Sequence, residues 1–131
     1  MILVDSNVWI FAETKGTAEH YLAIKKLQER LSEGVAINPI IFSEVFHKLS
    51  LLFDPVVART RVETIIHHPA VEWIGITREQ AVHALQLSVG MLLRINDALI
   101  AQHALELDLP ILTDNVKDFK KVSQLKLIPL R

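Results

Sequence analysis

Ile2-Leu3-Val4-Asp5, near the start of the chain, and Ile111-Leu112-Thr113-Asp114, near its end, share one pattern: a short apolar run followed by an acidic residue. Short apolar runs of this kind predict buried strands in a parallel sheet whose two faces are covered by helices. Because the carboxyl ends of parallel strands meet at one edge of the sheet, we expect Asp5 and Asp114 to lie close together. Neighbouring carboxylates repel each other unless a cation joins them. The pattern therefore indicates a divalent metal and metal-dependent chemistry on phosphates.

Strand and helix patterns alternate along the rest of the chain. Besides the strands at 2–4 and 110–113, the sequence predicts strands at 35–37, 71–74 and, at a sheet edge, 127–130. Helices are expected over residues 17–33, 39–52, 55–68, 77–89 and 97–107, and residues 117–124 fit either a short helix or a loop. This alternation predicts an α/β fold. With no linker or repeat, we expect residues 1–131 to form a single domain.

The ends of several predicted helices carry recognisable signals. Proline tolerates the first turn of a helix, which suits Pro39 and Pro55. Thr77 is followed three residues later by Gln80, the spacing of a capping box. Gly90 is expected to end the helix that begins there, and Asn96 is expected to cap the next one.

Composition narrows the class of protein. Of 131 residues, 50% are hydrophobic and 22% charged, which is typical of a globular chain. The net charge of −1 excludes a broadly basic nucleic-acid binder, but not a nuclease, since bound metals add positive charge at the site. The mean hydropathy of +0.31 is high for a small soluble domain and favours a homodimer or a bound partner chain. The absence of cysteine excludes disulfides and thiolate metal sites.

Targeting signals are also absent from the sequence. No charged segment precedes a long apolar stretch, and no apolar run reaches the length that spans a membrane. We therefore expect a cytoplasmic protein without a membrane partner.

Two further acids fall at positions where a carboxylate needs an explanation. Asp97 lies in the first turn of a helix that is apolar nearly all round, which puts it at the mouth of the core. Glu44 lies in a helix beside apolar residues, where an ionised side chain needs a cation or hydrogen-bond donors. Each acid alone has an ordinary structural interpretation, as a turn residue or a rim charge. The set of four in one small α/β chain favours a metal site.

Four segments of the chain resemble the acidic motifs of PIN-domain ribonucleases, especially VapC-type toxins of toxin–antitoxin pairs. They are, in order, Ile2-Leu3-Val4-Asp5-Ser6-Asn7-Val8, Asn38-Pro39-Ile40-Ile41-Phe42-Ser43-Glu44-Val45, Asn96-Asp97-Ala98-Leu99-Ile100-Ala101 and Ile111-Leu112-Thr113-Asp114-Asn115-Val116-Lys117-Asp118-Phe119. The resemblance covers the whole chain. It implies a PIN-like three-layer α/β/α fold with a short parallel sheet flanked by helices.

The resemblance also implies an endoribonuclease that uses Mg²⁺ or Mn²⁺, an antitoxin partner and an RNA substrate. Asp5, Glu44 and Asp97 are then metal ligands, directly or through water. Many relatives carry the fourth acid two residues after the motif threonine, where this chain has Asn115. Asp114 and Asp118 flank that position, and Asp114 is favoured because it directly follows the strand; otherwise the fourth acid is missing. The catalytic and metal-binding set predicted here is Asp5, Glu44, Asp97 and Asp114.

The expected chemistry follows from the preferences of hard cations. Mg²⁺ takes oxygen ligands and keeps several waters, and a bound water is more easily deprotonated for attack on a phosphodiester. Asn7 and Thr113, together with Ser6, are candidates for orienting ligands or contacting phosphate, and they equally suit turns. Asn115 and Asp118 complete the supporting set.

Basic residues that could contact RNA are sparse. Lys117, Lys120 and Lys121 lie near the predicted site, Arg94 precedes Asp97, and a second group comprises Lys25, Lys26 and Arg30. The histidines have no helical zinc-site spacing, and His20, His47, His83 and His103 are interpreted as partly buried packing residues.

Other functions were compared with the ribonuclease. A haloacid-dehalogenase-like phosphatase needs a second aspartate where this chain has Asn7, and a receiver domain needs an acidic pair that Asp5 does not provide. The stronger alternative is a catalytically weak PIN domain that acts as an RNA- or protein-binding module, and the departure at Asn115 motivates it.

Overall fold

Five short strands form one parallel sheet in the order β3-β2-β1-β4-β5 in the computed structural model, which describes residues 1–131. The strands are β1 (Ile2–Val4), β2 (Val35–Ile37), β3 (Val71–Trp73), β4 (Ile111–Thr113) and β5 (Leu127–Pro129). The predicted strands are confirmed to within one residue at each end. The chain builds outward from β1 to β3, then returns to place β4 on the other side of β1. The reversal between β1 and β4 is where open α/β sheets bind ligands.

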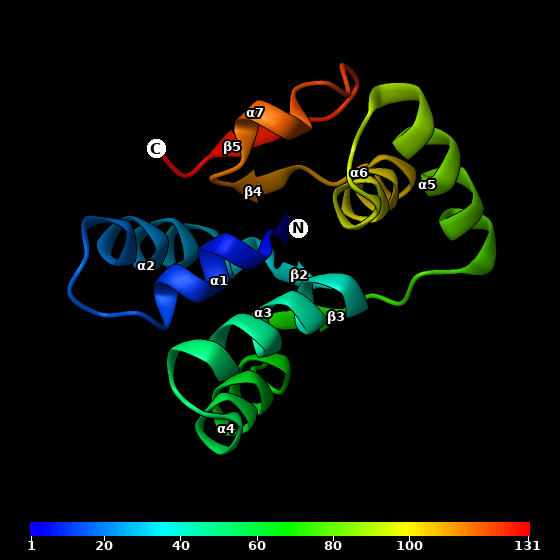
Figure 1. The fold of residues 1–131 in the computed structure, drawn as a ribbon. Helices are drawn as coiled ribbons and strands as arrows, with labels where there is room; N and C mark the ends of the chain where they lie inside the picture. The colour runs from blue at the N-terminus through cyan, green and yellow to red at the C-terminus, as the bar shows by residue number, and fades with distance from the viewer.

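Helices cover both faces of the sheet and confirm the three-layer α/β/α fold. They are α1 (Ser6–Ala12), α2 (Ala18–Arg30), α3 (Pro39–Leu52), α4 (Pro55–Ile66), α5 (Arg78–Met91), α6 (Ile95–Leu107) and α7 (Val116–Phe119), with a 3₁₀ turn at Leu31–Glu33. In Figure 1, α1 and α2 lie on one side of the row of strands, and α5 and α6 lie on the other. The α3–α4 pair extends from the β3 end of the sheet.

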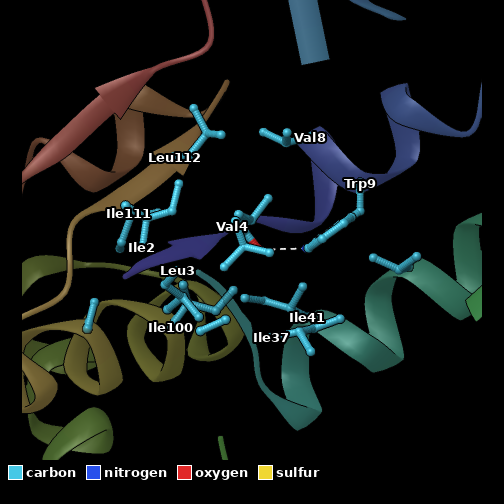
Figure 2. Packing of buried hydrophobic residues seen from close by; sticks show 14 of the residues in the cluster. Ile2, Leu3, Val4, Val8, Trp9, Ile37, Ile41, Ile100, Ile111 and Leu112 are labelled. Carbon is cyan, nitrogen blue, oxygen red and sulfur yellow. Dashed lines mark hydrogen bonds between the residues drawn. The ribbon is translucent and has the colours of Figure 1, made fainter. Parts of the chain in front are cut away.

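A single cluster of 27 buried hydrophobic residues holds the layers together. All residues of β1, β2 and β4 are buried, which explains why these strands are apolar except for Thr113 at the end of β4. Ile100 of α6 packs beneath β1, while Val8 of α1 lies above it (Figure 2). Each such aliphatic side chain contributes about 1.5–3 kcal/mol when fully buried. Trp9 of α1 also donates its indole N–H to the carbonyl oxygen of Val4 at 3.1 Å (Figure 2).

Side-chain caps begin several helices. Asn38 caps α3 by accepting the Ile41 backbone N–H at 2.9 Å, and its amide donates to Nδ1 of the buried His103 at 3.0 Å. This pair connects α3 to α6 through the core. The capping box predicted at Thr77 and Gln80 is confirmed.

Three features of the helices differ from the sequence prediction. Helix α1 was not predicted, because seven residues are too few to show a helical repeat. Helix α5 continues through Gly90 and ends at Met91, with Leu92 in the left-handed conformation at φ 53°. Asn96 lies inside α6 and does not cap it, since the helix begins at Ile95 and the cap position is Arg94.

Apolar side chains remain exposed on two surfaces. The α3–α4 tip surface consists of Phe46, Leu51, Leu52, Phe53, Val56 and Val57. The α5 surface consists of Val82, Leu85, Val89, Met91, Leu92 and Ile95. No single helix is long and apolar enough to cross a membrane; α5 and α6 meet that criterion only as a pair, and they are bent by 118°.

Candidate active site

The predicted site residues converge at the carboxyl ends of β1 and β4. Asp5 directly follows β1, and Thr113 is the last residue of β4. The two strands are paired, so the Asp5 backbone N–H donates to the Leu112 carbonyl at 2.9 Å. Asp5 and Asp114 therefore follow neighbouring strands, but the carboxylate of Asp114 binds Arg131 and does not join that of Asp5.

Three donors fix the side chain of Asp5, which is 4% exposed. Its Oδ1 accepts the Ser6 backbone N–H at 2.8 Å, which caps α1. Its Oδ2 accepts the hydroxyl of Thr113 at 2.7 Å and the amide of Asn7 at 3.2 Å. The Thr113 hydroxyl in turn accepts the backbone N–H of Asn115 at 2.8 Å. Asp5 is thus locked to both strands and to the loop that follows β4.

Burial raises the pKa of Asp5 to about 6, from an ordinary value of 3.8. The hydrogen bonds from Thr113 and Ser6 oppose the rise in pKa, while the charges of Glu44 and Asp97 add to it. These two acids come from α3 and α6, and both lie close enough to Asp5 for their charges to affect its pKa. Three of the four predicted acids are therefore brought together.

Glu44 and Asp97 are held much more loosely than Asp5. Glu44 Oε2 accepts one long hydrogen bond from Asn96 at 3.4 Å. The carboxylate of Asp97 accepts no hydrogen bond and forms no ion pair. Burial raises its pKa, Arg94 and Lys121 lower it, and Glu44 and Asp118 raise it. Both carboxylates keep oxygen atoms available to a ligand.

The acid favoured for the fourth position, Asp114, is paired with a cation of the same chain. Arg131 donates to its two carboxylate oxygens at 3.0 Å each, and also donates to Glu19 at 2.8 Å. The backbone N–H of Asp114 donates to Asn7 Oδ1 at 3.1 Å. Asp114 therefore ties the loop after β4 to the chain terminus and to α2.

The alternative fourth acid, Asp118, lies near Asp97. It lies in the first turn of α7, and its charge raises the pKa of Asp97. Its carboxylate is 3.7 Å from the ammonium of Lys121. The structure thus brings Asp118 to the acidic group and directs the carboxylate of Asp114 to Arg131.

The acidic side chains lie near one another but do not converge on a single point. No three side chains of His, Cys, Asp or Glu are close enough to hold a metal ion together. Asp5 has little freedom to move, whereas Glu44 and Asp97 have few restraints. Any ion that binds here has to draw the loose acids inward or reach them through water.

A cleft of about 470 Å³ opens beside Glu44. It is lined by α1, α3 and the start of α6, and the side chains include Asn7, Ile10, Phe11, Glu44, His47, Lys48, Arg94 and Asn96. Sequence reasoning missed Lys48, and its interpretation of His47 and His83 as partly buried packing residues is wrong, because both are exposed. The signal available for Lys48 was its place one helical turn after Glu44.

Comparison with known proteins agrees with this arrangement. The family model described as the PIN domain matches residues 2–125. The fold is similar to VapBC of Salmonella typhimurium, solved bound to DNA, with 19% identity, full coverage of both chains and a TM-score of 0.80. It is also similar to VapBC2 of Rickettsia felis, solved with a promoter DNA fragment, with 20% identity, 98% of each chain covered and a TM-score of 0.79.

A third similar structure is the VapC20 toxin of Mycobacterium tuberculosis, described as cleaving the sarcin–ricin loop. It shows 16% identity over 89% of this chain and 93% of that one, with a TM-score of 0.75. No curated protein sequence matches the chain. The chain belongs to the PIN domain family.

Proposed function

We propose that this PIN domain is an endoribonuclease that depends on Mg²⁺ or Mn²⁺ and is the toxin of a type II toxin–antitoxin pair, acting in the cytoplasm. One observation carries the enzymatic part of the proposal. Asp5, Glu44 and Asp97 come from three separate parts of the fold and lie close enough together at the edge of the sheet that the charges of the other two acids raise the pKa of Asp5. A cation in their midst removes that repulsion.

The donor set fits a divalent cation that keeps part of its water shell. The available ligands are carboxylate oxygens, which Mg²⁺ and Mn²⁺ prefer. Because no three acids lie at the distance of shared coordination, ligation partly through water fits the arrangement best. Asp5, Glu44 and Asp97 would hold the cation. Asp118 is the better candidate for the fourth acid, since Arg131 already neutralises Asp114.

When bound, the cation supplies an easily deprotonated water and neutralises charge on the phosphate. The residues of the chain supply the geometry. Thr113 and Asn7 hold Asp5 in one orientation, and Asn96 steadies Glu44. In the reaction, the oxygen of water bonds to phosphorus, the bond to the 3′-oxygen breaks, and that oxygen leaves with a proton.

The proposed partner is an antitoxin protein. A toxin–antitoxin complex of Klebsiella pneumoniae and several VapBC structures are among the similar structures. The α3–α4 tip surface and the α5 surface leave large apolar side chains exposed, which supports both a bound partner chain and a homodimer. The product of an adjacent reading frame should neutralise the toxicity of the chain, and light scattering should report a dimer.

Cleavage assays test the enzymatic proposal. Purified protein should cleave RNA in the presence of Mg²⁺ or Mn²⁺, and cleavage should stop when EDTA is added. Asp97→Asn should abolish cleavage, while Lys126→Ala, at an exposed position just before β5, should retain it. Cleavage that resists EDTA, or that survives Asp97→Asn, would falsify the proposal.

The second candidate is a binding module with little or no activity. The spread of the acids and the pairing of Asp114 with Arg131 favour it. It predicts that the protein binds RNA or a partner equally well with and without divalent cations. Turnover of RNA that depends on Asp97 excludes it.

A further inference from the structure

One polar pair crosses the core between the two helices that carry the loosely held acids. Asn38, at the cap of α3, and His103 of α6 are 0% and 1% exposed. The Asn38 amide donates to Nδ1 of His103 at 3.0 Å, while its Oδ1 accepts the Ile41 backbone N–H at 2.9 Å. Because the cap fixes which end of the amide faces the ring, Nδ1 has to be the acceptor and the proton lies on Nε2. The pair therefore has one allowed polarity, with a neutral ring.

The stability of the core does not account for this pair. Burial lowers the pKa of His103, and the nearby Gly75 backbone opposes that change, but Nε2 has no hydrogen-bond partner. A buried polar group without a partner costs free energy, and an apolar side chain of similar size would avoid that cost. The other buried residues of α6 are all alanine or isoleucine. What the polar pair supplies, and apolar packing lacks, is a fixed direction and register between two helices.

The two loosely held acids lie at matching distances from the pair. Glu44 is six residues after Asn38 along α3, and Asp97 is six residues before His103 along α6. At 1.5 Å per residue, each acid is about 9 Å along its helix from the pair. The charge of Glu44 acts on Asp97, so both acids lie on the same side of the pair. At that end the helices share only the 3.4 Å hydrogen bond from Asn96 to Glu44.

Resting on the proposed function, we propose that Asn38 and His103 are positioning residues that set the separation of Glu44 and Asp97 before a cation binds. Both members of the pair are buried, so neither contacts the cation or the substrate. The side chains of the acids make the final adjustment, and the positions of α3 and α6 limit how far each carboxylate has to move. Fixing these positions lowers the cost of bringing the acids together, and the affinity for the cation rises.

Cation binding in the absence of RNA tests the proposal. Mn²⁺ is titrated into the protein, and the free ion is measured by electron paramagnetic resonance, so no turnover is needed. Asn38→Ser keeps a good helix cap but removes the amide donor, and His103→Leu removes the acceptor. Each should raise the Kd for Mn²⁺ about tenfold, the lower end of the effect of outer partners of metal ligands. The double variant should bind no more weakly than either single variant, because both residues act through one hydrogen bond.

Two further variants separate positioning from a general loss of stability. His103→Asn offers an amide oxygen as acceptor in place of Nδ1 and should restore most of the affinity lost in His103→Leu. Ile65→Val opens a small cavity in the core beside α4, so it should lower the melting temperature and leave the Kd for Mn²⁺ unchanged. Melting curves of the cation-free variants are recorded alongside. If His103→Leu does not fold, Asn38→Ser and His103→Asn carry the comparison.

The results distinguish this proposal from the nuclease proposal. A wild-type Kd in Asn38→Ser and His103→Leu, or an equal loss in Ile65→Val, overturns the positioning role and leaves the nuclease proposal intact. Additive losses in the double variant overturn the hydrogen bond as their common cause. A wild type that binds no Mn²⁺ overturns both proposals, whereas the expected Kd values without any RNA cleavage overturn only the nuclease.

Discussion

The two walls of the acidic site are built in opposite ways. On the wall formed by β1 and β4, Asp5 is 4% exposed and accepts three hydrogen bonds from groups of the fold. On the wall formed by α3 and α6, Glu44 accepts a single hydrogen bond of 3.4 Å, and Asp97 accepts none. The carboxylate on the strand wall has its hydrogen bonds without a ligand, whereas the two carboxylates on the helix wall do not.

This difference assigns separate tasks to the two walls. The cost of burying the Asp5 carboxylate is partly offset by its donors, so folding fixes where it lies. Glu44 and Asp97 sit on helices whose caps and cores do not involve these side chains. They can adjust to a ligand without loss of structure. We infer that the strand wall sets the position of a cation and that the helix wall completes its binding.

The largest expected effect comes from removing the loose acids. Asp97→Asn and Glu44→Gln should each lower cleavage at least about a hundredfold, since even outer partners of metal ligands cost about 10–100-fold. The melting temperature of the cation-free protein should stay level or rise, because a repulsive charge is lost. Urea or thermal unfolding beside an RNA cleavage assay measures both. A variant that is both unfolded and inactive would contradict the separation of tasks.

The pH dependence should follow Asp5. Its pKa of about 6 in the cation-free protein means that, at cation concentrations below saturation, cleavage falls as pH drops below about 6, by about tenfold per unit, because a protonated carboxyl is a poor cation ligand. The raised pKa also means that the folded, cation-free protein binds this proton more tightly than the unfolded chain. The stability from Asp5 is therefore greatest below pH 4 and is lost as pH rises through about 6, by about 3 kcal/mol.

Burial of His103 acts in the opposite direction. It lowers the pKa of His103, so the stability from this residue is lost as pH falls below its ordinary value of 6.5. The free energy of unfolding is measured against pH for the wild type and for Asp5→Asn. The difference between the two profiles gives the contribution of Asp5 to the pH dependence of stability. A difference profile that is flat between pH 4 and pH 7 would rule out the raised pKa.

Thr113→Val tests the support of the strand wall. The change removes the donor to Asp5 and the acceptor of the Asn115 N–H, both in a buried setting. We expect a loss of about 1–3 kcal/mol in unfolding free energy and a further rise in the pKa of Asp5. The acid limb of the pH–rate profile should then move to higher pH. Asn96→Ala on the helix wall is the matched control and should leave that limb where it is.

Arg131→Gln should give the smallest effect. Its pairs with Asp114 and Glu19 are partly exposed, and such pairs contribute little to stability. A slight drop in melting temperature at low salt should vanish at high salt. Activity should persist if Asp118 is the fourth acid. A large loss of activity in Arg131→Gln or Asp114→Asn would instead identify Asp114 as the fourth acid of the site.

The three central strands, β1, β2 and β4, were predictable because they are buried on both faces. Such strands consist mostly of apolar residues, so Ile2–Val4 and the residues Ile111 and Leu112 stand out as apolar runs. The acids that follow two of these runs indicate which strand ends meet at the site. They do not give the order of the strands, which also depends on the reversal at β1. Helix α1 was hidden because it is short and its cap, Asp5, was already interpreted as a site residue.

The acidic residues of the candidate site could be predicted from the sequence, but its other polar groups could not. Asp5, Glu44 and Asp97 lie at element ends or on a helix face, which local patterns indicate. The partner of Asp114 is Arg131, 17 residues away, and no local pattern predicts such a pair. Lys48 and Arg94 meet at the cleft because α3 and the start of α6 pack together, so the place of Lys48 one helical turn after Glu44 gained its meaning only from the tertiary structure.

Trp9 gives the protein a built-in optical reporter. Its indole is 6% exposed and is hydrogen-bonded to the carbonyl of Val4, the residue immediately before Asp5. The second tryptophan, Trp73, is 47% exposed at the edge strand β3, so Trp73→Phe leaves emission from Trp9 alone. The emission wavelength of that single indole then reports the electrostatic surroundings of β1. Titration with Mg²⁺ or Mn²⁺ becomes readable in unlabelled protein, without any substrate present.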